Sequence, residues 1–152
     1  MNKIIFTKFL IILFFVSSCG YSPIFSNKNS NFSIVEIKST GNSNLNKILI
    51  NKLDYYKNTS GKKKFSLKIY TSLKKEVASK DTKGNPKTYK MNVSLKIYSE
   101  DEKNNLEEKS FSKSTNYNNS SNKFKLKKYE NETAKNLTEK IAEEIIIYLQ
   151  SI

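Results

Sequence analysis

The residues that could do chemistry are few in this chain of 152 residues. It contains no His and no Trp, and its single Cys is Cys19. The commonest general base is therefore missing, and neither a His-based nor a Cys-rich metal site can form. No glycine-rich phosphate loop, dinucleotide fingerprint or nucleophile elbow accompanies the carboxylates. We expect no catalytic residues, no metal and no cofactor, and hence no enzyme; a hydrolase that uses two carboxylates is the alternative of that class.

The chemistry open to Cys19 follows from its position. Two lysines and an unbroken apolar run over residues 9–16 precede it, and two serines separate that run from the Cys. This is the order of a secretory signal, and the run is shorter than the roughly 20 residues that a membrane span needs. Residues 16–19 resemble a bacterial lipobox. We expect residues 1–18 to be a signal peptide and Cys19 to carry lipid; a plain signal peptide with an incidental Cys is the alternative.

The segment after Cys19 predicts where the mature chain is held. Several acyl chains on one Cys anchor a protein stably, whereas a single chain gives marginal binding. Gly20 follows the Cys, where Asp favours the inner membrane in enteric bacteria, so the sequence is compatible with the periplasmic side of the outer membrane. Residues 19–31 are expected to be the lipidated Cys and a polar tether that contains Pro23.

The charge is strongly basic, with a net value of +13, and all 27 basic residues are Lys. The absence of Arg disfavours modules that read bases, because bidentate contacts to guanine favour Arg. Export also argues against nucleic acid as a partner. Phosphates, acidic lipids and acidic proteins remain possible partners. The abundance of Lys, Asn and Ile is also what an AT-rich genome produces, so compositional drift is the alternative cause of the charge.

Residues 32–152 are expected to form one domain, which begins with a strand and a helix. Residues 32–38 are rich in β-forming residues and predict the strand. Ser43 is a suitable cap for a helix that begins near Asn44, and apolar residues then repeat every three to four positions. Gly61 is the expected stop of this helix.

Two long strands are predicted from strict alternation of apolar and polar residues over residues 65–73 and 89–98. Residues 78–87 read as a loop between them, and residues 99–105 as a turn. Residues 106–117 are a weaker candidate in which Lys residues share a face with aromatic ones, as suits an edge strand. The alternation does not decide parallel against antiparallel pairing.

The last segment, residues 127–152, is expected to be a helix with one apolar stripe. The order of elements is therefore β-α-β-β-β-α. It predicts an α+β fold of two layers, in which two helices cover one face of a four-stranded sheet. The other face would present lysines and the tyrosines Tyr70 and Tyr98, which could be packing pads.

With these elements in place, the start of the mature chain resembles a known family. The sequence Cys-Gly-Tyr-Ser-Pro-Ile-Phe over residues 19–25 is similar to the Cys-Gly-aromatic-x-Pro-Leu-Tyr start of the LPS-assembly lipoproteins, the LptE family. The layout agrees over the rest of the chain, including a strand that closes on Tyr117, a loop containing Ser120 and a helix over residues 134–149. Ile24 and Phe25 replace the commoner Leu and Tyr, and the central loop lacks the Arg often found there.

The resemblance implies an outer-membrane lipoprotein that plugs the lumen of the large β-barrel LptD and helps that barrel assemble. Together the two proteins insert lipopolysaccharide into the outer leaflet, and the lipoprotein could contact the glycolipid directly. A rigid domain with polar surfaces suits the polar lumen of a barrel. The alternative is a periplasm-facing lipoprotein that serves as a structural or interaction module of another envelope complex.

Three lysines are the candidate contacts for lipopolysaccharide phosphates or for acidic residues of the barrel wall. They are Lys68, Lys90 and Lys96, which alternation places on the open face of adjacent strands. A solvated strand face in a Lys-rich chain is the alternative interpretation.

Overall fold

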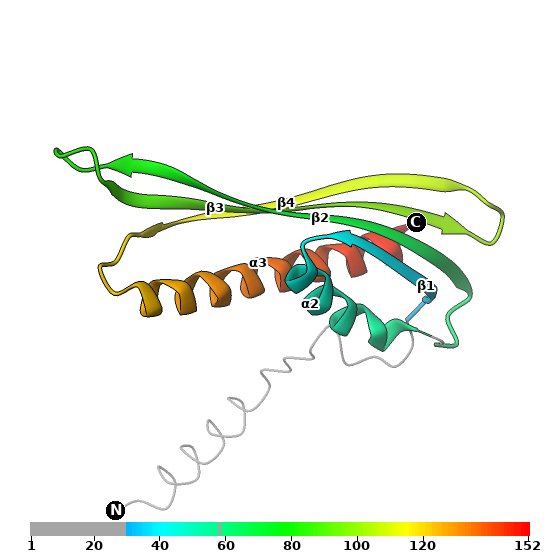
Figure 1. The fold of residues 1–152 in the computed structure, drawn as a ribbon. Helices are drawn as coiled ribbons and strands as arrows, with labels where there is room; N and C mark the ends of the chain where they lie inside the picture. Colours follow the sequence, from blue (N-terminus) through cyan, green and yellow to red (C-terminus); the bar gives the residue numbers. More distant parts are fainter. Residues whose placement is uncertain (1–29, 58) are drawn as a thin grey trace, which may run out of the picture.

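A four-stranded sheet and two helices form two layers in the computed structural model, which describes residues 30–57 and 59–152 (Figure 1). Both helices lie on the same face of the sheet, so the predicted α+β architecture and its β-α-β-β-β-α order are confirmed. The elements are β1 (Phe32–Gly41), α2 (Ser43–Leu53), the 3-10 turn η2 (Asp54–Tyr56), β2 (Lys63–Lys80), β3 (Pro86–Asp101), β4 (Leu106–Asn118) and α3 (Lys123–Ser151).

The strands lie in the order β1-β2-β3-β4, and the sheet is mixed. β1 pairs with β2 in parallel, and α2 makes the connection between them. β2, β3 and β4 form an antiparallel meander. β4 is an edge strand, as its shared Lys and aromatic positions predicted.

The core lies between the sheet and the helices. Phe65, Leu67 and Ile69 of β2 alternate with exposed or half-buried residues, which confirms the period-two prediction for this strand. β3 contributes four buried apolar side chains, Met91, Val93, Leu95 and Ile97. The helices bury apolar stripes against them: Leu45, Leu49 and Leu53 of α2, and Leu126, Ala134, Leu137, Ile141, Ala142, Ile145, Ile146 and Leu149 of α3.

The first helix differs from its prediction at both ends. Asn42, not Ser43, is the N-cap, because its side-chain oxygen accepts hydrogen bonds from the backbone N–H groups of Asn44 and Leu45. The helix ends at Leu53 and tightens into η2, so Gly61 does not stop it. A Cβ atom on Gly61 would lie 2.2 Å from the carbonyl carbon of Phe32, so this Gly permits a close approach of two backbones.

The sheet is longer than predicted, because the turns at the two ends of β3 are tight. The sequences Asp-Thr-Lys-Gly-Asn (81–85) and Asp-Glu-Lys-Asn-Asn (101–105) fold alike. In each, the Asp carboxylate accepts two backbone N–H bonds, from the third and fifth residues, and the fourth residue has a positive φ. The predicted loop at 78–87 therefore shortens to residues 81–85. The last helix also begins earlier than predicted, at Lys123, where the Asn122 side chain caps it.

β1 ends opposite the middle of β2, where Thr71 closes the turn into α2. The Thr71 hydroxyl donates to the Asn46 side chain at 2.8 Å and accepts from the Asn42 backbone N–H at 2.9 Å. Gly41 adopts a φ of 99°, and a Cβ there would lie 2.0 Å from the Thr71 carbonyl oxygen. Beyond Thr71 the sheet therefore continues without β1, and β2 and β3 extend as an arm that passes over the first turns of α3 (Figure 1).

Candidate functional site

The candidate site residues fall in two places. Cys19 and the predicted signal peptide and tether up to residue 29 lie outside the described residues. The three candidate lysines lie where alternation predicted, exposed on the sheet face that the helices leave open. Within residues 30–57 and 59–152, no group of three metal-ligating side chains exists, and no helix there is long and apolar enough to span a membrane.

The three lysines do not form one cluster. Lys68 of β2 pairs with Tyr98, and Lys96 of β3 pairs with Tyr70, so these two lysines are diagonal neighbours. Lys90 pairs with Glu76, which is eight residues farther along β2 than Lys68. At the ordinary rise of a strand this separates them by about 26 Å. Lys68 and Lys96 can act on one ligand group, whereas Lys90 belongs to a different part of the face.

Lys96 already has a charged partner. Its ammonium lies 2.5 Å from the carboxylate of Glu108 on β4. A hydrogen bond to Glu108 raises the pKa of Lys96, and hydrogen bonds from Lys96 and Tyr98 lower the pKa of Glu108. The pair is open to solvent, so it is only weakly stabilising. A phosphate at this point would have to compete with Glu108 for the lysine.

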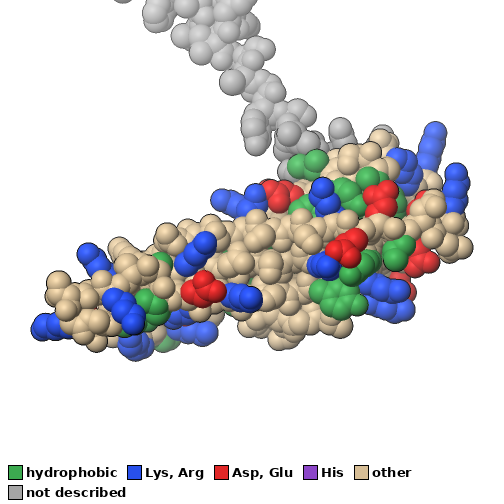
Figure 2. Space-filling view, turned by 90° about the horizontal axis from the view of Figure 1, so that it is seen from above, with side chains coloured by type: hydrophobic (Ala, Val, Ile, Leu, Met, Phe, Trp, Pro, Cys, Tyr) green, Lys and Arg blue, Asp and Glu red, His purple; other side chains and the backbone are tan. Residues whose placement is uncertain are grey.

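The middle of the open face is neutral and slightly hollow. Tyr70 and Tyr98 pack edge to face with ring centroids 5.8 Å apart, which agrees with their expected role as packing pads. Beside them, Ser72, Ser94 and Ser112 form one row across three strands and line a shallow depression. Figure 2 looks onto this face, where lysines are scattered along the length and few charges cross the middle.

The two ends of β3 carry opposite charge. Residues 74–90, which form the β2–β3 arm, contain six Lys against two acidic residues. Residues 99–109, around the β3–β4 turn, contain five acidic residues against two Lys. The start of β2 brings Lys62, Lys63 and Lys64 to the acidic turn, where Lys64 pairs with Glu102. The arm keeps a surplus of four positive charges, six Lys less two acidic residues, so a negatively charged partner is attracted to it.

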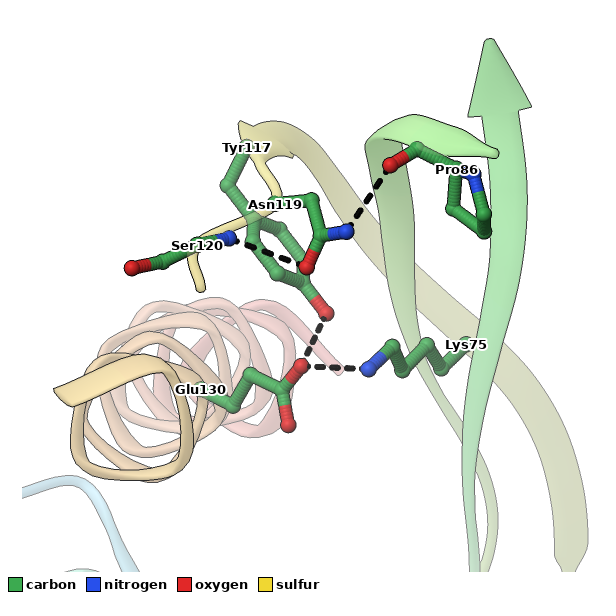
Figure 3. Close-up of polar contacts among 6 residues, drawn as sticks. All are labelled: Lys75, Pro86, Tyr117, Asn119, Ser120 and Glu130. Carbon is green, nitrogen blue, oxygen red and sulfur yellow. Dashed lines mark hydrogen bonds and ion pairs between the residues drawn. The ribbon is translucent and has the colours of Figure 1, made fainter. Parts of the chain in front are cut away.

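A polar cluster joins the arm to α3, and the sequence reasoning did not identify it (Figure 3). Glu130 of α3 accepts a hydrogen bond from the Lys75 ammonium at 2.6 Å and one from the Tyr117 hydroxyl at 2.8 Å. The Lys75 ammonium also lies 3.9 Å from the centre of the Tyr89 ring. The sequence does carry a signal for this cluster. Lys75 stands where the period of the strand expects an apolar residue, and Glu130 stands where the period of the helix expects one.

The pKa values of this cluster follow from burial and pairing. Burial raises the pKa of Glu130, but the hydrogen bonds from Lys75 and Tyr117 outweigh it and hold that pKa below its ordinary value. Burial and the hydrogen bond to Glu130 raise the pKa of Tyr117. The cluster is therefore an ionic bridge, flanked by aromatic rings, that substitutes for apolar packing between the arm and the helix.

The loop between β4 and α3 is fixed to the same region. The Asn119 side-chain amide donates to the Pro86 carbonyl oxygen at 2.8 Å, and its oxygen accepts from the Ser120 backbone N–H at 2.9 Å (Figure 3). The connection after Tyr117 is thus held against the start of β3. The arrangement offers charged and polar surfaces suited to binding.

Comparison with known proteins gives structural neighbours only. The chain matches no model of a protein family, and no curated protein is similar to it in sequence. Rare lipoprotein B from Shewanella oneidensis superposes with a TM-score of 0.62 at 14% identity, covering 78% of this chain and 95% of that one.

Two further neighbours are lipoproteins as well. A minor lipoprotein from Acinetobacter baumannii gives a TM-score of 0.60 at 10% identity, over 78% of this chain and 91% of that one. Lipoprotein B from Nitrosomonas europaea gives 0.58 at 10% identity, over 79% and 85%. The chain therefore shares its fold with bacterial lipoproteins.

Proposed function

We propose that this protein is a lipoprotein of the outer membrane, anchored on the periplasmic side through Cys19. It plugs and helps assemble a β-barrel of the LptD type and so aids insertion of lipopolysaccharide into the outer leaflet. The observation that carries the proposal is the fold shared with rare lipoprotein B over 95% of that chain. The lipobox-like residues 16–19 and the start at residues 19–25 support it independently.

The surface of the domain supports a place inside a barrel. The lumen of such a barrel is polar and water-filled. The outer side of α3 presents Lys128, Asn136, Lys140 and Glu143 to solvent, and the open face of the sheet presents serines and lysines. Both layers are thus mainly polar on the outside, with Phe124 and Ile147 of α3 and Tyr70 of β2 as exposed apolar or aromatic exceptions.

The start of the described chain lies at the opposite end of β2 from the arm, which supports an arrangement in which the arm points away from the anchor. Ser30 is held at the start of β1, where its hydroxyl donates to the Phe32 carbonyl oxygen. Phe32 pairs with Lys63, the first residue of β2. The 18 residues of β2 extend over about 55 Å to the arm. The basic arm is thus the end of the sheet farthest from Ser30, the first described residue.

Within this proposal, Lys68, Lys90 and Lys96 contact phosphates of lipopolysaccharide or acidic residues of the barrel wall. Lys68 has the better access to an external anion, because its neighbour across the parallel pair is Lys38 and not an acid. Lys90 lies on the basic arm, opposite Glu76. Lys serves as a point charge for phosphate and needs no bidentate geometry.

Co-purification tests the main proposal. The full-length protein, with an affinity tag after a flexible linker at its C-terminus, is expressed in its native host and extracted in mild detergent. We expect a stoichiometric LptD-type barrel to co-purify, and Cys19→Ala to lower both membrane association and barrel yield. Recovery with an unrelated envelope complex would instead indicate a general interaction module.

Charge reversal tests the role of the lysines separately. The triple change Lys68→Glu, Lys90→Glu and Lys96→Glu is expected to reduce lipopolysaccharide binding and outer-membrane integrity while leaving the far-UV circular dichroism spectrum unchanged. The triple change Lys47→Glu, Lys128→Glu and Lys140→Glu is the matched control, because it alters the net charge equally at exposed positions of the helix layer. Unchanged outer-membrane integrity in the triple variant would show that the open face is simply solvated.

A further inference from the structure

We propose that the outer edge of β2 beyond β1 binds an extended, acidic strand of another protein by adding it to the sheet. β1 ends at Gly41, opposite Thr71, whereas β2 continues to Lys80. From residue 72 onward, no other described strand pairs with this side of β2. The site is therefore a gap in the sheet, in line with β1 and about as long as β1 itself.

The direction of the backbone groups can be followed from the last contact with β1. The Asn42 N–H donates to the Thr71 carbonyl oxygen at 3.3 Å, so the backbone of Thr71 points to the outer side. In an antiparallel ladder, alternate residues point toward and away from the partner strand. The N–H and C=O groups of Leu73, Lys75 and Val77 therefore point outward, away from β3. They form a row of hydrogen-bonding groups that an added strand can satisfy.

The side chains at the same positions provide an apolar contact. Leu73 and Val77 are 37% and 45% exposed on the face of the sheet that elsewhere forms the core. α2 lies beneath β1 and does not reach the arm, so α3 is the described helix that passes under this part of the sheet (Figure 1). It contacts Lys75, which lies between Leu73 and Val77 on the same face, through Glu130, and it leaves Leu73 and Val77 partly exposed. A strand with apolar residues at every second position would cover them and continue the core along the arm.

Charge selects the class of occupant. The arm carries six Lys against two acidic residues, and one of the six, Lys75, is already paired with Glu130 of α3. On the open face of this edge Lys74 is exposed, and Glu76, two residues farther on, lies opposite Lys90. Pairing two copies of this arm would bring lysines together, which opposes a second copy of the chain as occupant. An extended segment with acidic residues alternating with apolar ones complements both faces of the edge. This inference does not depend on the identity of the barrel proposed above.

Short peptides of defined sequence test the edge. The mature full-length lipoprotein in detergent is mixed with EVEVEVE, with KVKVKVK, or with EVEVEVE methylated on alternate backbone nitrogens. We expect only the first peptide to slow amide exchange at Leu73, Lys75 and Val77, by about tenfold or more. Binding of the lysine peptide or of the methylated peptide to the same extent would overturn the proposal, as would equal protection along the edge of β4.

A matched pair of variants separates edge binding from non-specific attraction. Val77→Thr keeps the β-branched shape but removes apolar contact, and we expect it to weaken EVEVEVE binding about fivefold. Val35→Thr on β1 is the control, since Val35 is similarly exposed, at 57%, but lies away from this edge. Equal effects of both variants would overturn the proposal. A concentration-dependent dimer abolished by Val77→Thr would also overturn it, because a second copy would then be the occupant.

Discussion

The two halves of the sheet are held to the helices in different ways. Around β1 and α2, the contacts are apolar and closed: Ile34, Leu49 and, from α3, Ile145 are completely buried, and the ring of Phe32 stacks on that of Tyr56. Along the arm, β2 and β4 meet α3 through the ionic bridge of Lys75, Glu130 and Tyr117, and Leu73 and Val77 are partly exposed. One half is stabilised by apolar burial, and the other by a few directional contacts. We therefore expect the arm to open locally before the rest unfolds.

The largest expected effect tests whether the half of the sheet around β1 and α2 contributes most of the unfolding free energy. Ile145→Ala removes a fully buried side chain and is expected to cost about 2–5 kcal/mol of unfolding free energy. Val77→Ala on the arm is expected to cost less than about 1 kcal/mol, because that side chain is already 45% exposed. Chemical denaturation of both variants measures the difference. Equal losses would mean that the arm is as tightly packed as the core.

The second effect concerns the ionic bridge. Glu130→Gln is expected to lower the unfolding free energy at neutral pH by about 1–2 kcal/mol, since Lys75 loses its charged partner. The folded-state pKa of Glu130 is lowered, so its contribution is present above the unfolded pKa and is lost as pH falls through the folded value. The variant and the parent protein should therefore converge in strongly acidic solution. A constant difference at all pH values would exclude the ionic origin.

The same bridge predicts behaviour at alkaline pH. The pKa of Tyr117 is raised in the folded protein, so its contribution is complete below the unfolded pKa of about 10 and falls as pH rises above it. Tyr117→Phe is expected to remove part of this alkaline loss. The measurement is the denaturation midpoint as a function of pH, with Tyr55→Phe as the control at an exposed position.

The smallest expected effect compares the turns at the two ends of β3. Gly84 at the arm tip has a φ of 83° and open space around it, so Gly84→Ala should cost about 1 kcal/mol from backbone strain alone. Asn104 occupies the matching position of the other turn with a φ of 60°, and Asn104→Gly should stabilise by a few tenths of a kcal/mol at about the limit of detection. Thermal melting of both variants tests whether the turns are equivalent.

Periodicity was enough to predict the layers, because alternation in residues 65–73 and 89–98 and the stripe in the last helix depend on local spacing alone. Asn42 and Ser43 are both good N-cap residues, so local preference does not choose between them. The role of Gly61 was missed for a different reason. Gly61 is required by the backbone of Phe32, which is 29 residues away, and only the folded chain brings the two together. The strand ends were placed too early because the turn sequences at Asp81 and Asp101 also suit a loop.

The candidate site was predicted less completely. The exposed face of Lys68, Lys90 and Lys96 followed from alternation, but their separation depends on register, which no local pattern fixes. Cys19 lies outside the described residues, so lipidation stays a prediction. The bridge of Lys75, Glu130 and Tyr117 does not follow from local patterns, because its residues come from β2, α3 and β4, which only the folded chain brings together. The free edge of β2 depends on where β1 stops, which the Thr71 contacts determine.

The two similar turns around β3 also have a consequence for the order of folding. Each turn brings neighbouring strands together across only five residues, and each Asp fixes its own loop without help from the rest of the protein. The meander of β2, β3 and β4 can therefore assemble quickly from local contacts. The parallel pairing of β1 requires closure of a longer loop through α2. We expect β1 to pair with β2 last, so that the first strand is added to an already formed meander in the final step of folding.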